Sequence, residues 1–305
     1  MTGLEGTGLE GTGLPMTALA VAAGRAVETT RPGALVADPY AAALVAGVQS
    51  NLDFPVAWPA DPASAPPLQQ PLLLASTYIG LRTRFIDDFL QREPGTAQTV
   101  ILGAGLDTRA YRLDWPACSR VLELDHSNVL DYKARVMERL SVVPACELVT
   151  VVADLSQPWG EAATCAGFDR QLPTTWIVEG LLPYLSAEGQ LTTLREVLSL
   201  STAGSRAVIE RAVALPATEE VQAKLRDFSA QTGLSMEELL ARADPPDPAR
   251  LLESAGWNCA EHSVAELSAR YGRAISLDAT DEPVREDRND GARGGFVTAW
   301  LPASA

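Results

Sequence analysis

A short apolar run, Gln98 to Gly103 (QTVILG), constrains the fold of this chain more than any other segment. The run contains β-branched residues and ends at a glycine, which is typical of a buried parallel strand that enters a tight turn. Further apolar runs recur along the chain at 120–124, 148–152, 175–178 and 205–210. Helix-compatible stretches lie between them at 128–140 and 190–198. This alternation predicts an α/β fold, an open and mostly parallel sheet with helices on both faces.

The segments around these strands differ in composition. Residues 1–16 repeat a GTGLE unit and cannot bury enough apolar surface to offset their ordering entropy, so we expect them to be flexible. Residues 17–96 contain helical patterns, including an apolar periodicity at 77–90. Residues 97–305 form the predicted core, and it carries a helical insertion at about 212–254. Beyond the insertion the sequence predicts a helix at 264–271, a charged loop at 278–289 and a terminal strand at 295–301.

The composition argues against several classes of partner. A formal net charge of −15 disfavours the broad basic surface that nucleic acid requires. No apolar run approaches the roughly 20 residues of a membrane span. The N-terminus lacks the basic and apolar regions of a secretory signal, so we expect a cytoplasmic protein with no membrane partner. The four cysteines are far apart and show no CxxC spacing, and no metal site is predicted.

Polar residues follow four of the predicted strands, and they are the candidate ligand contacts. In an open α/β sheet, ligands bind beyond the carboxyl ends of the strands. The first strand leads into the glycine turn Gly103–Arg109 (GAGLDTR). The second carries Glu123 and Asp125, about 20 residues on, where an acid accepts hydrogen bonds from a ribose diol. The third precedes Asp154–Leu155, and the fourth precedes Glu179–Tyr184. Together they predict a site for an adenosyl ligand.

The glycine turn also distinguishes between two adenosyl ligands. A dinucleotide fingerprint needs a third glycine where Thr108 stands, and Asp107 would place a carboxylate beside the pyrophosphate. S-adenosylmethionine carries an ammonium, a carboxylate and a sulfonium instead. The turn can offer carbonyls and Asp107 to the ammonium, while a nearby arginine binds the carboxylate. The sequence therefore favours S-adenosylmethionine over NAD.

Five segments give the chain a resemblance to a known family. It resembles the leucine carboxyl methyltransferases, in particular the actinobacterial S-adenosylmethionine-dependent branch and the related polyketide carboxyl methylases. The matching segments are RTRFIDDF at 82–89, VILGAGLDTRAYRL at 100–113, LELDHSNVLDYK at 122–133, VADLSQPW at 152–159 and WIVEGLLPYLS at 176–186. The resemblance implies a Rossmann-like class I methyltransferase fold. That fold has a seven-stranded sheet, an antiparallel terminal strand and a helical N-terminal cover, here residues 17–96.

The resemblance also implies roles for individual residues at the cofactor. Gly103 and Gly105 would line the methionine half, and Asp125 would hold the ribose hydroxyls. Asp154 and Leu155 would flank the adenine, with Asp154 accepting from its amino group.

Charged residues would hold the ends of the methionine half. Glu179 would face the amino group or the sulfonium side of the cofactor. Arg82 would bind the methionine carboxylate, with Arg84 as the second choice. Arg25 is the nearest match to a basic residue that the N-terminal cover contributes in the family, although the GTGLE repeat and the spacing to Asp38 depart from the family pattern.

The chemistry of methyl transfer narrows the choice of acceptor. The reaction is an in-line displacement at an activated methyl group, and a carboxylate acceptor needs no general base. A hydroxyl acceptor does need one, but the chain has only two histidines, His126 and His262. His126 is the candidate at the site, with Tyr184 as an orienting group, whereas His262 is expected at the surface. The scarcity of histidine favours carboxyl O-methylation of a small molecule, such as a secondary metabolite, or of a peptide.

Three alternatives remain open at this point. The chain could be a hydroxyl O-methyltransferase of natural-product biosynthesis, or a regulatory protein that binds the cofactor without catalysis. It could also be an NAD(P)-dependent oxidoreductase. The identity of the acceptor and the oligomeric state are not predicted by the sequence.

Overall fold

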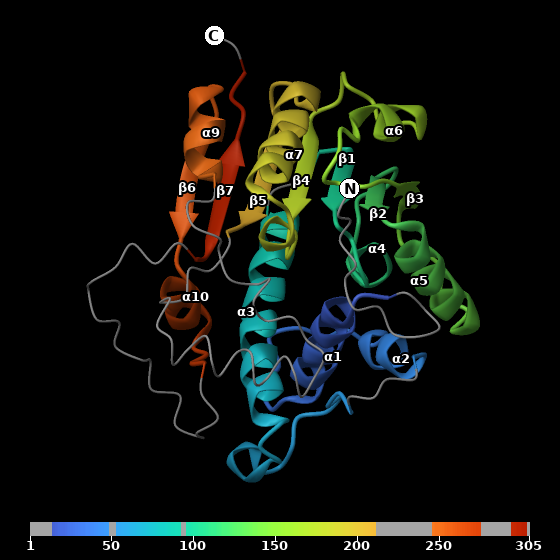
Figure 1. Cartoon of the computed structure of the whole chain (residues 1–305), viewed down its shortest axis with the longest axis vertical. Coiled ribbons are helices and arrows are strands. Elements are labelled where there is room, and N and C mark those ends of the chain that lie inside the picture. Colours follow the sequence, from blue (N-terminus) through green and yellow to red (C-terminus); the bar gives the residue numbers. More distant parts are fainter. Residues whose placement is uncertain (1–13, 49–52, 93–95, 212–245, 276–293, 304–305) are drawn as a thin grey trace.

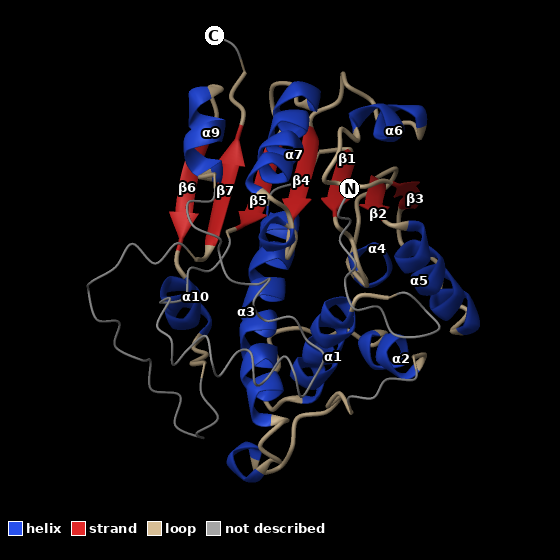
Figure 2. Cartoon of the chain, in the orientation of Figure 1, coloured by secondary structure: helices blue, strands red, loops and turns tan. Residues whose placement is uncertain are grey.

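The computed structural model describes residues 14–48, 53–92, 96–211, 246–275 and 294–303. These residues form a seven-stranded sheet in the order β3-β2-β1-β4-β5-β7-β6 (Figure 1, Figure 2). β1 to β5 pair in parallel, and β7 runs antiparallel to both of its neighbours, β5 and β6. The strands are β1 Gln98–Leu102, β2 Arg120–Asp125, β3 Glu147–Val152, β4 Thr174–Val178, β5 Arg206–Glu210, β6 Asn258–His262 and β7 Phe296–Trp300. The sheet is open and mostly parallel and contains an antiparallel strand from the end of the chain, as predicted.

Helices cover both faces of this sheet, which confirms the predicted layering (Figure 2). They are α1 Met16–Thr30, α2 Ala41–Ala46, η1 Pro62–Ser64, α3 Gln70–Arg92, α4 Arg109–Arg112, α5 Ser127–Arg139, α6 Gly160–Cys165, η2 Leu182–Tyr184, α7 Ala187–Leu200, α9 Pro248–Ser254 and α10 Val264–Tyr271. Apolar residues of α6, α7 and α9 pack with one face of the sheet around Trp159 and Trp176. Residues of α3, α4 and α10 pack with the other face around Phe85 and Phe296.

The burial of each strand follows its place in the sheet. Every residue of β1 and β4 is buried, as expected of central parallel strands that are covered on both faces. The edge strand β6 (NCAEH) has no buried residue and was not predicted, because its polar sequence lacks the apolar run of a central strand. Its place at the edge permits that composition, since one side of an edge strand faces solvent.

The N-terminal helices cover the carboxyl ends of the strands. Figure 1 shows α1 and α2 beyond the tips of β1 and β4, beside the lower part of α3. α1 packs along α3, and the cover has its own apolar cluster, which extends to Val129 and Val136 of α5. Leu14 and Met16 are buried in this cluster, although the sequence analysis assigned them to the flexible N-terminus. The cover thus begins at least three residues before the predicted start at residue 17.

Several predicted segments lie wholly or partly outside the described residues. They are the GTGLE repeat, most of the helical insertion at 212–254 and the charged loop at 278–289. The described end of the insertion is α9, whose N-cap Asp247 accepts a hydrogen bond from the Ala249 amide at 3.0 Å. None of the helices within the described ranges is both long and apolar enough to cross a membrane.

Candidate cofactor site

The turn after β1 is fixed to the end of β2 by its own backbone. The amides of Gly103 and Ala104 both donate to the carbonyl of Leu124, at 2.9 and 3.1 Å. Gly103 has φ +65° and Gly105 has φ +51°, in the left-handed region that favours glycine. A Cβ at Gly103 would lie 3.1 Å from the Leu181 side chain, so a larger residue here requires that side chain to shift. The sequence places the two glycines where the chain reverses direction above the sheet.

Asp125 lies next to this turn, at the end of β2. One carboxylate oxygen accepts from the Gly105 amide at 2.6 Å, and the other accepts from the His126 amide at 2.7 Å. Asp125 is only half-buried, and its carboxylate can accept further hydrogen bonds. The structure therefore brings the predicted ribose acid and the predicted glycine turn into direct contact.

Arg109, the last residue of the GAGLDTR motif, joins three acids at the strand ends. It is 2% exposed and lies 2.7 Å from Asp87, 2.6 Å from Glu179 and in contact with Asp107. Arg112 binds the second oxygen of Asp87 at 2.6 Å. No individual role was predicted for Arg109 from the sequence. Its position at the end of the GAGLDTR motif is the sequence feature that could have indicated one.

Arg82 extends this chain of ion pairs to β5. It contacts Glu179 at 2.7 Å and Glu210 at 3.1 Å. Glu210 also accepts from the Tyr78 hydroxyl and from the Gly180 amide, the latter at 2.6 Å. The arginine that the resemblance assigned to the methionine carboxylate thus has two internal carboxylates as partners in this structure. Glu210 was not predicted as a site residue, although it lies at the carboxyl end of a predicted strand, like the other acids of the site.

The arginines keep the acids of the site ionised. Burial opposes ionisation of Glu179, yet Arg109 and Arg82 lower its pKa below the ordinary value. Burial opposes ionisation of Asp107 as well, and Arg109 and Lys133 lower its pKa. Carboxylates with lowered pKa values are poor proton acceptors at neutral pH. Burial and the Glu210 charge raise the pKa of Tyr78 well above its usual value, so Tyr78 stays a hydrogen-bond donor.

The cover is tied to the glycine turn by a second group of contacts. Arg25 of α1 binds Asp38 at 2.7 Å and donates to the Leu106 carbonyl at 2.6 Å. Thr108 donates to the same Asp38 at 2.7 Å. The structure therefore places Arg25, the basic residue expected from the cover, against the backbone of the cofactor turn.

Other predicted residues have separate surroundings. Glu123 is 0% exposed and pairs with Lys133 at 2.7 Å, so we leave it out of the proposed cofactor contacts. Arg84 is on the outer side of α3, where it pairs with Asp88 at 2.9 Å. The Leu155 side chain belongs to the main core, while Asp154 is exposed and accepts from the Ser156 amide and hydroxyl. Their contact with adenine stays a prediction.

The candidate catalytic residues lie on the loops around the turn. His126 occupies the N-cap position of α5, is exposed, and makes no side-chain cap hydrogen bond. Tyr184 ends η2 and is half-buried; the Leu181 side chain of the same loop approaches Gly103. His262 is half-buried rather than fully at the surface, because its ring packs at a tilt against the Phe85 ring, with 5.0 Å between the ring centroids. A role for these residues in catalysis is not shown by this geometry.

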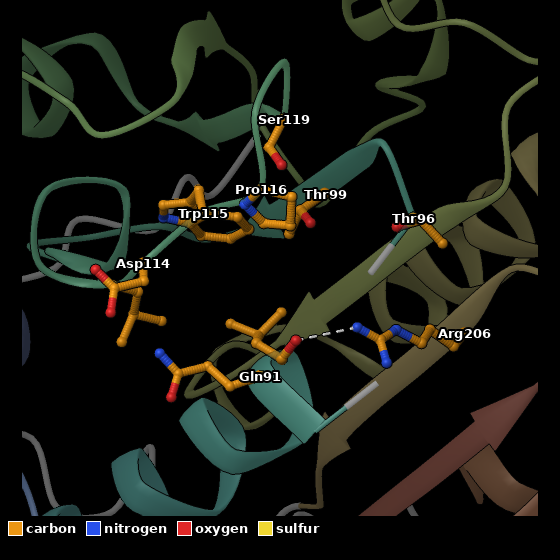
Figure 3. Close-up of a pocket in the computed structure, with 10 residues that line it drawn as sticks. Gln91, Thr96, Thr99, Asp114, Trp115, Pro116, Ser119 and Arg206 are labelled. Atoms are coloured by element: carbon orange, nitrogen blue, oxygen red, sulfur yellow. Dashed lines mark hydrogen bonds between the residues drawn. The ribbon is translucent and has the colours of Figure 1, made fainter. Parts of the chain in front are cut away.

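Two cavities lie away from the glycine turn. A cavity of about 20 Å³ lies at the amino ends of β1 and β5, where Arg206 donates to the Leu90 carbonyl at 3.3 Å (Figure 3). It therefore lies at the opposite ends of the strands from the glycine turn, and it is large enough for about one water molecule. A polar cavity of about 200 Å³ lies at the carboxyl ends of β5 and β6, between Arg211 and His262. Among the described residues, no group of three or more His, Cys, Asp or Glu side chains could hold a metal ion.

The profile of one protein family matches residues 18–198, more than half of the chain. The chain belongs to the leucine carboxyl methyltransferase family. Its relatives include a "Putative S-adenosyl-L-methionine-dependent methyltransferase" of Saccharopolyspora erythraea, 38% identical over 92% of this chain and 93% of the relative. A protein of the same printed name in Mycobacterium tuberculosis is 36% identical, over 93% of this chain and 92% of the relative.

Among solved structures, this leucine carboxyl methyltransferase family member is similar to a putative methyltransferase from Thermobifida fusca. The two are 17% identical with a TM-score of 0.49, and the match covers 93% of this chain and 94% of the other. The family and its relatives show that this protein is an S-adenosylmethionine-dependent methyltransferase. The site fits that cofactor, because Gly103 and Gly105 carry no side chain that would keep a ligand from the turn and the Asp125 carboxylate is held beside it.

Proposed function

We propose that this methyltransferase esterifies a carboxylate of a small molecule or a peptide. The observation that carries the proposal is the pairing of the acids at the strand ends. Asp107, Glu179 and Glu210 each contact an arginine, so none of them is a free proton acceptor. A carboxylate acceptor suits such a site, since it is already ionised at neutral pH and needs only to be held in line with the methyl group.

The histidines support the same proposal by their positions. A general base must come within about 2.6–3.2 Å of the proton that it removes. His262 ends β6, and β6 lies three strand spacings from β4, which amounts to about 14 Å at the usual spacing. His126 follows Asp125 on the ribose side, two strands away from Glu179, which follows β4, and three strands away from Glu210, which ends β5. Neither position favours deprotonation of a hydroxyl acceptor near the end of β4.

The proposed cofactor contacts follow from the geometry of the turn. Gly103 and Gly105 allow close approach of the methionine half, and Asp125 accepts from the ribose hydroxyls. Arg82 and Glu179, which pair with each other at 2.7 Å, would exchange that contact for the carboxylate and the ammonium of the cofactor. When bound, the cofactor supplies the activated methyl group. Tyr184 is proposed to orient the acceptor.

The experiment is methyl transfer from isotopically labelled S-adenosylmethionine to matched acceptor pairs. Each pair holds a carboxylic acid and the alcohol of the same carbon skeleton, and products are identified by mass spectrometry. We expect label in an ester that mild base releases as methanol. Label in a base-stable ether would instead favour a hydroxyl O-methyltransferase. Binding of S-adenosylhomocysteine without any product from acids, alcohols, peptides or cell extract would favour the regulatory alternative. The Asp125→Ala variant is the negative control for both products.

The biological setting is proposed from the resemblance to polyketide carboxyl methylases. A free carboxylate on a secondary metabolite would become a neutral methyl ester. Extracts of an actinobacterial producer, incubated with labelled cofactor and the enzyme, provide the test. A labelled methyl ester of a small molecule whose mass-spectrometric signal increases only with active enzyme supports this setting. A labelled peptide would instead identify a peptide as the acceptor.

A further inference from the structure

The Glu210 carboxylate accepts hydrogen bonds from three groups, and each of its oxygens has two donor contacts. Its Oε1 atom accepts from the Tyr78 hydroxyl and from Arg82 at 3.2 Å. Its Oε2 atom accepts from the Gly180 amide at 2.6 Å and from Arg82 at 3.1 Å. The residue is 6% exposed and ends β5, so the carboxylate is held at the sheet edge next to β4.

These donors belong to the two groups proposed to hold the methionine half. Arg82 is the proposed partner of the cofactor carboxylate, and Gly180 directly follows Glu179, the proposed partner of the ammonium. Gly180 has φ +60°, a conformation that few other residues would adopt, and its amide is directed at Glu210. Glu210 therefore contacts both arms of the methionine site while remaining behind them.

We propose that Glu210, held by Tyr78, is a positioning residue for the amino-acid half of S-adenosylmethionine. It holds the Nη1 atom of Arg82, whereas Glu179 contacts the Nε atom, and it holds the Glu179–Gly180 turn to the end of β5. This inference rests on the proposed contacts of Arg82 and Glu179 with the cofactor. It assigns no contact between Glu210 and the ligand itself.

The substitution Glu210→Gln tests this role with almost no change in volume. One oxygen becomes an NH₂ group, which faces either the Tyr78 hydroxyl and Arg82 or the Gly180 amide and Arg82. The Tyr78 hydroxyl can accept from that NH₂ group, but Arg82 has only donors, so in either orientation a donor meets a donor at Arg82. Arg82 then keeps only Glu179 as a contact of full opposite charge.

The chain offers a matched control in Glu196→Gln. Glu196 of α7 is also partly buried and also accepts from a glycine amide, that of Gly160 at 2.9 Å. It lies at the contact of α6 and α7, away from the cofactor turn. Its substitution changes the same functional group in the same kind of hydrogen bond without touching the methionine site.

The measurement is the binding of two ligands by calorimetry, S-adenosylhomocysteine and 5′-methylthioadenosine. The second ligand has the adenosine and the thioether but lacks the amino-acid group. We expect Glu210→Gln to weaken S-adenosylhomocysteine binding about tenfold, as for the loss of one charge-assisted hydrogen bond, and to leave 5′-methylthioadenosine binding within a factor of two. Glu196→Gln should change neither. An equal loss for both ligands, or no loss for either, overturns the role of Glu210.

The wild-type protein separates this inference from the proposed contacts beneath it. If it bound both ligands equally, the placement of the methionine half at Arg82 and Glu179 would be wrong. If it preferred S-adenosylhomocysteine and Glu210→Gln kept that preference, only the role of Glu210 would fall. Should Glu210→Gln fail to fold, Tyr78→Phe replaces it, with a selective loss of about threefold expected for the removal of one hydrogen bond. Its control is Tyr132→Phe, which removes a hydroxyl that donates to the Leu44 carbonyl in the cover.

Discussion

Gly103 and Gly272 have similar backbone angles and different neighbours. Their φ values are +65° and +60°; a Cβ at Gly103 would meet Leu181 at 3.1 Å, whereas one at Gly272 would meet nothing within 4 Å. Substitution by alanine should lower the free energy of unfolding by about 1 kcal/mol at either position, because both require a left-handed conformation. Only Gly103→Ala should also weaken S-adenosylhomocysteine binding.

Denaturant unfolding and calorimetry on the two variants check this prediction. Gly272 ends α10 in the left-handed C-cap conformation, so Gly272→Ala reports the backbone cost alone. Unchanged cofactor affinity in Gly103→Ala would show that the turn does not approach the ligand.

Asp125 gives a second prediction at the scale of a single residue. Asp125→Ala removes the proposed ribose contact and the acceptor for the Gly105 amide, which it binds at 2.6 Å. We expect S-adenosylhomocysteine and 5′-methylthioadenosine to bind more weakly by the same amount, about 1–3 kcal/mol, because both carry the ribose. Calorimetry with both ligands is the measurement. Undiminished affinity would remove Asp125 from the site.

The sequence predicted the proximity of the strand-end residues better than the partners of the ion pairs. Gly103, Gly105 and Asp125 lie together, as predicted, because a strand that ends in a glycine turn determines where the next strand end must lie. Arg82 was noticed, but its contact with Glu210 depends on how α3 packs across the end of β5, 128 residues later in the chain. Sequence periodicity indicates which face of a helix is apolar, and it does not indicate which distant acid an arginine will reach.

At the scale of elements, Asp38 connects the cover to the cofactor turn. Burial disfavours its charged form, yet Arg25 and Arg112 lower its pKa below 3.8. A lowered folded-state pKa means that its ionisation stabilises the fold above the unfolded pKa and ceases to do so as pH falls through the folded pKa. Asp38→Asn should therefore cost about 3 kcal/mol at pH 7, as for a broken buried pair, and progressively less as the pH falls below about 4.

Urea denaturation of wild type and Asp38→Asn across pH 7 to 3 measures this difference. The control is Glu147→Gln, which breaks the exposed pair with Arg120, 3.0 Å apart with side chains 35% and 56% exposed. Such a surface pair contributes about 0–1 kcal/mol. A loss for Asp38→Asn that did not change with pH would contradict an electrostatic role for Asp38.

The elements that the sequence missed are short or polar. α6 has only six residues, too few for a helical period to show, and β6 has no buried residue. β6 forms because β7 presents a free edge to it, with Asn258 paired to Trp300 and His262 to Phe296. That pairing partner comes from the end of the chain, so no local pattern could predict it.

At the scale of the whole molecule, one chain of contacts runs from the cover to β5. It links four arginines with five acids: Arg25, Arg82, Arg109 and Arg112 with Asp38, Asp87, Asp107, Glu179 and Glu210, and Thr108 bridges Asp38 and Arg112. Four positive and five negative groups leave a formal charge of −1. The sulfonium, ammonium and carboxylate of the cofactor sum to +1, so the described network and its ligand are complementary in charge.

This network leads to a prediction for the pH dependence of the enzyme. Glu179 and Asp107 have lowered pKa values and stay ionised at neutral pH, while Tyr78 stays protonated because its pKa is raised well above 10. Neither side of a bell-shaped profile then comes from these groups between pH 6 and pH 9. With a carboxylate acceptor, kcat/KM should be flat over that range and fall only below about pH 5, where the acceptor itself is protonated.

Steady-state rates with the best carboxylic acid acceptor, measured at constant ionic strength, check the profile. His262→Asn is the control, because His262 ends β6, the strand at the other edge of the sheet from β2 and β3, and burial lowers its pKa below 6.5. It should leave the profile unchanged. A rising limb between pH 6 and pH 9 that persisted in His262→Asn but disappeared in His126→Asn would assign a base to His126. Such a result would contradict carboxylate methylation and favour hydroxyl methylation, since only a protonated acceptor has a proton for that base to remove.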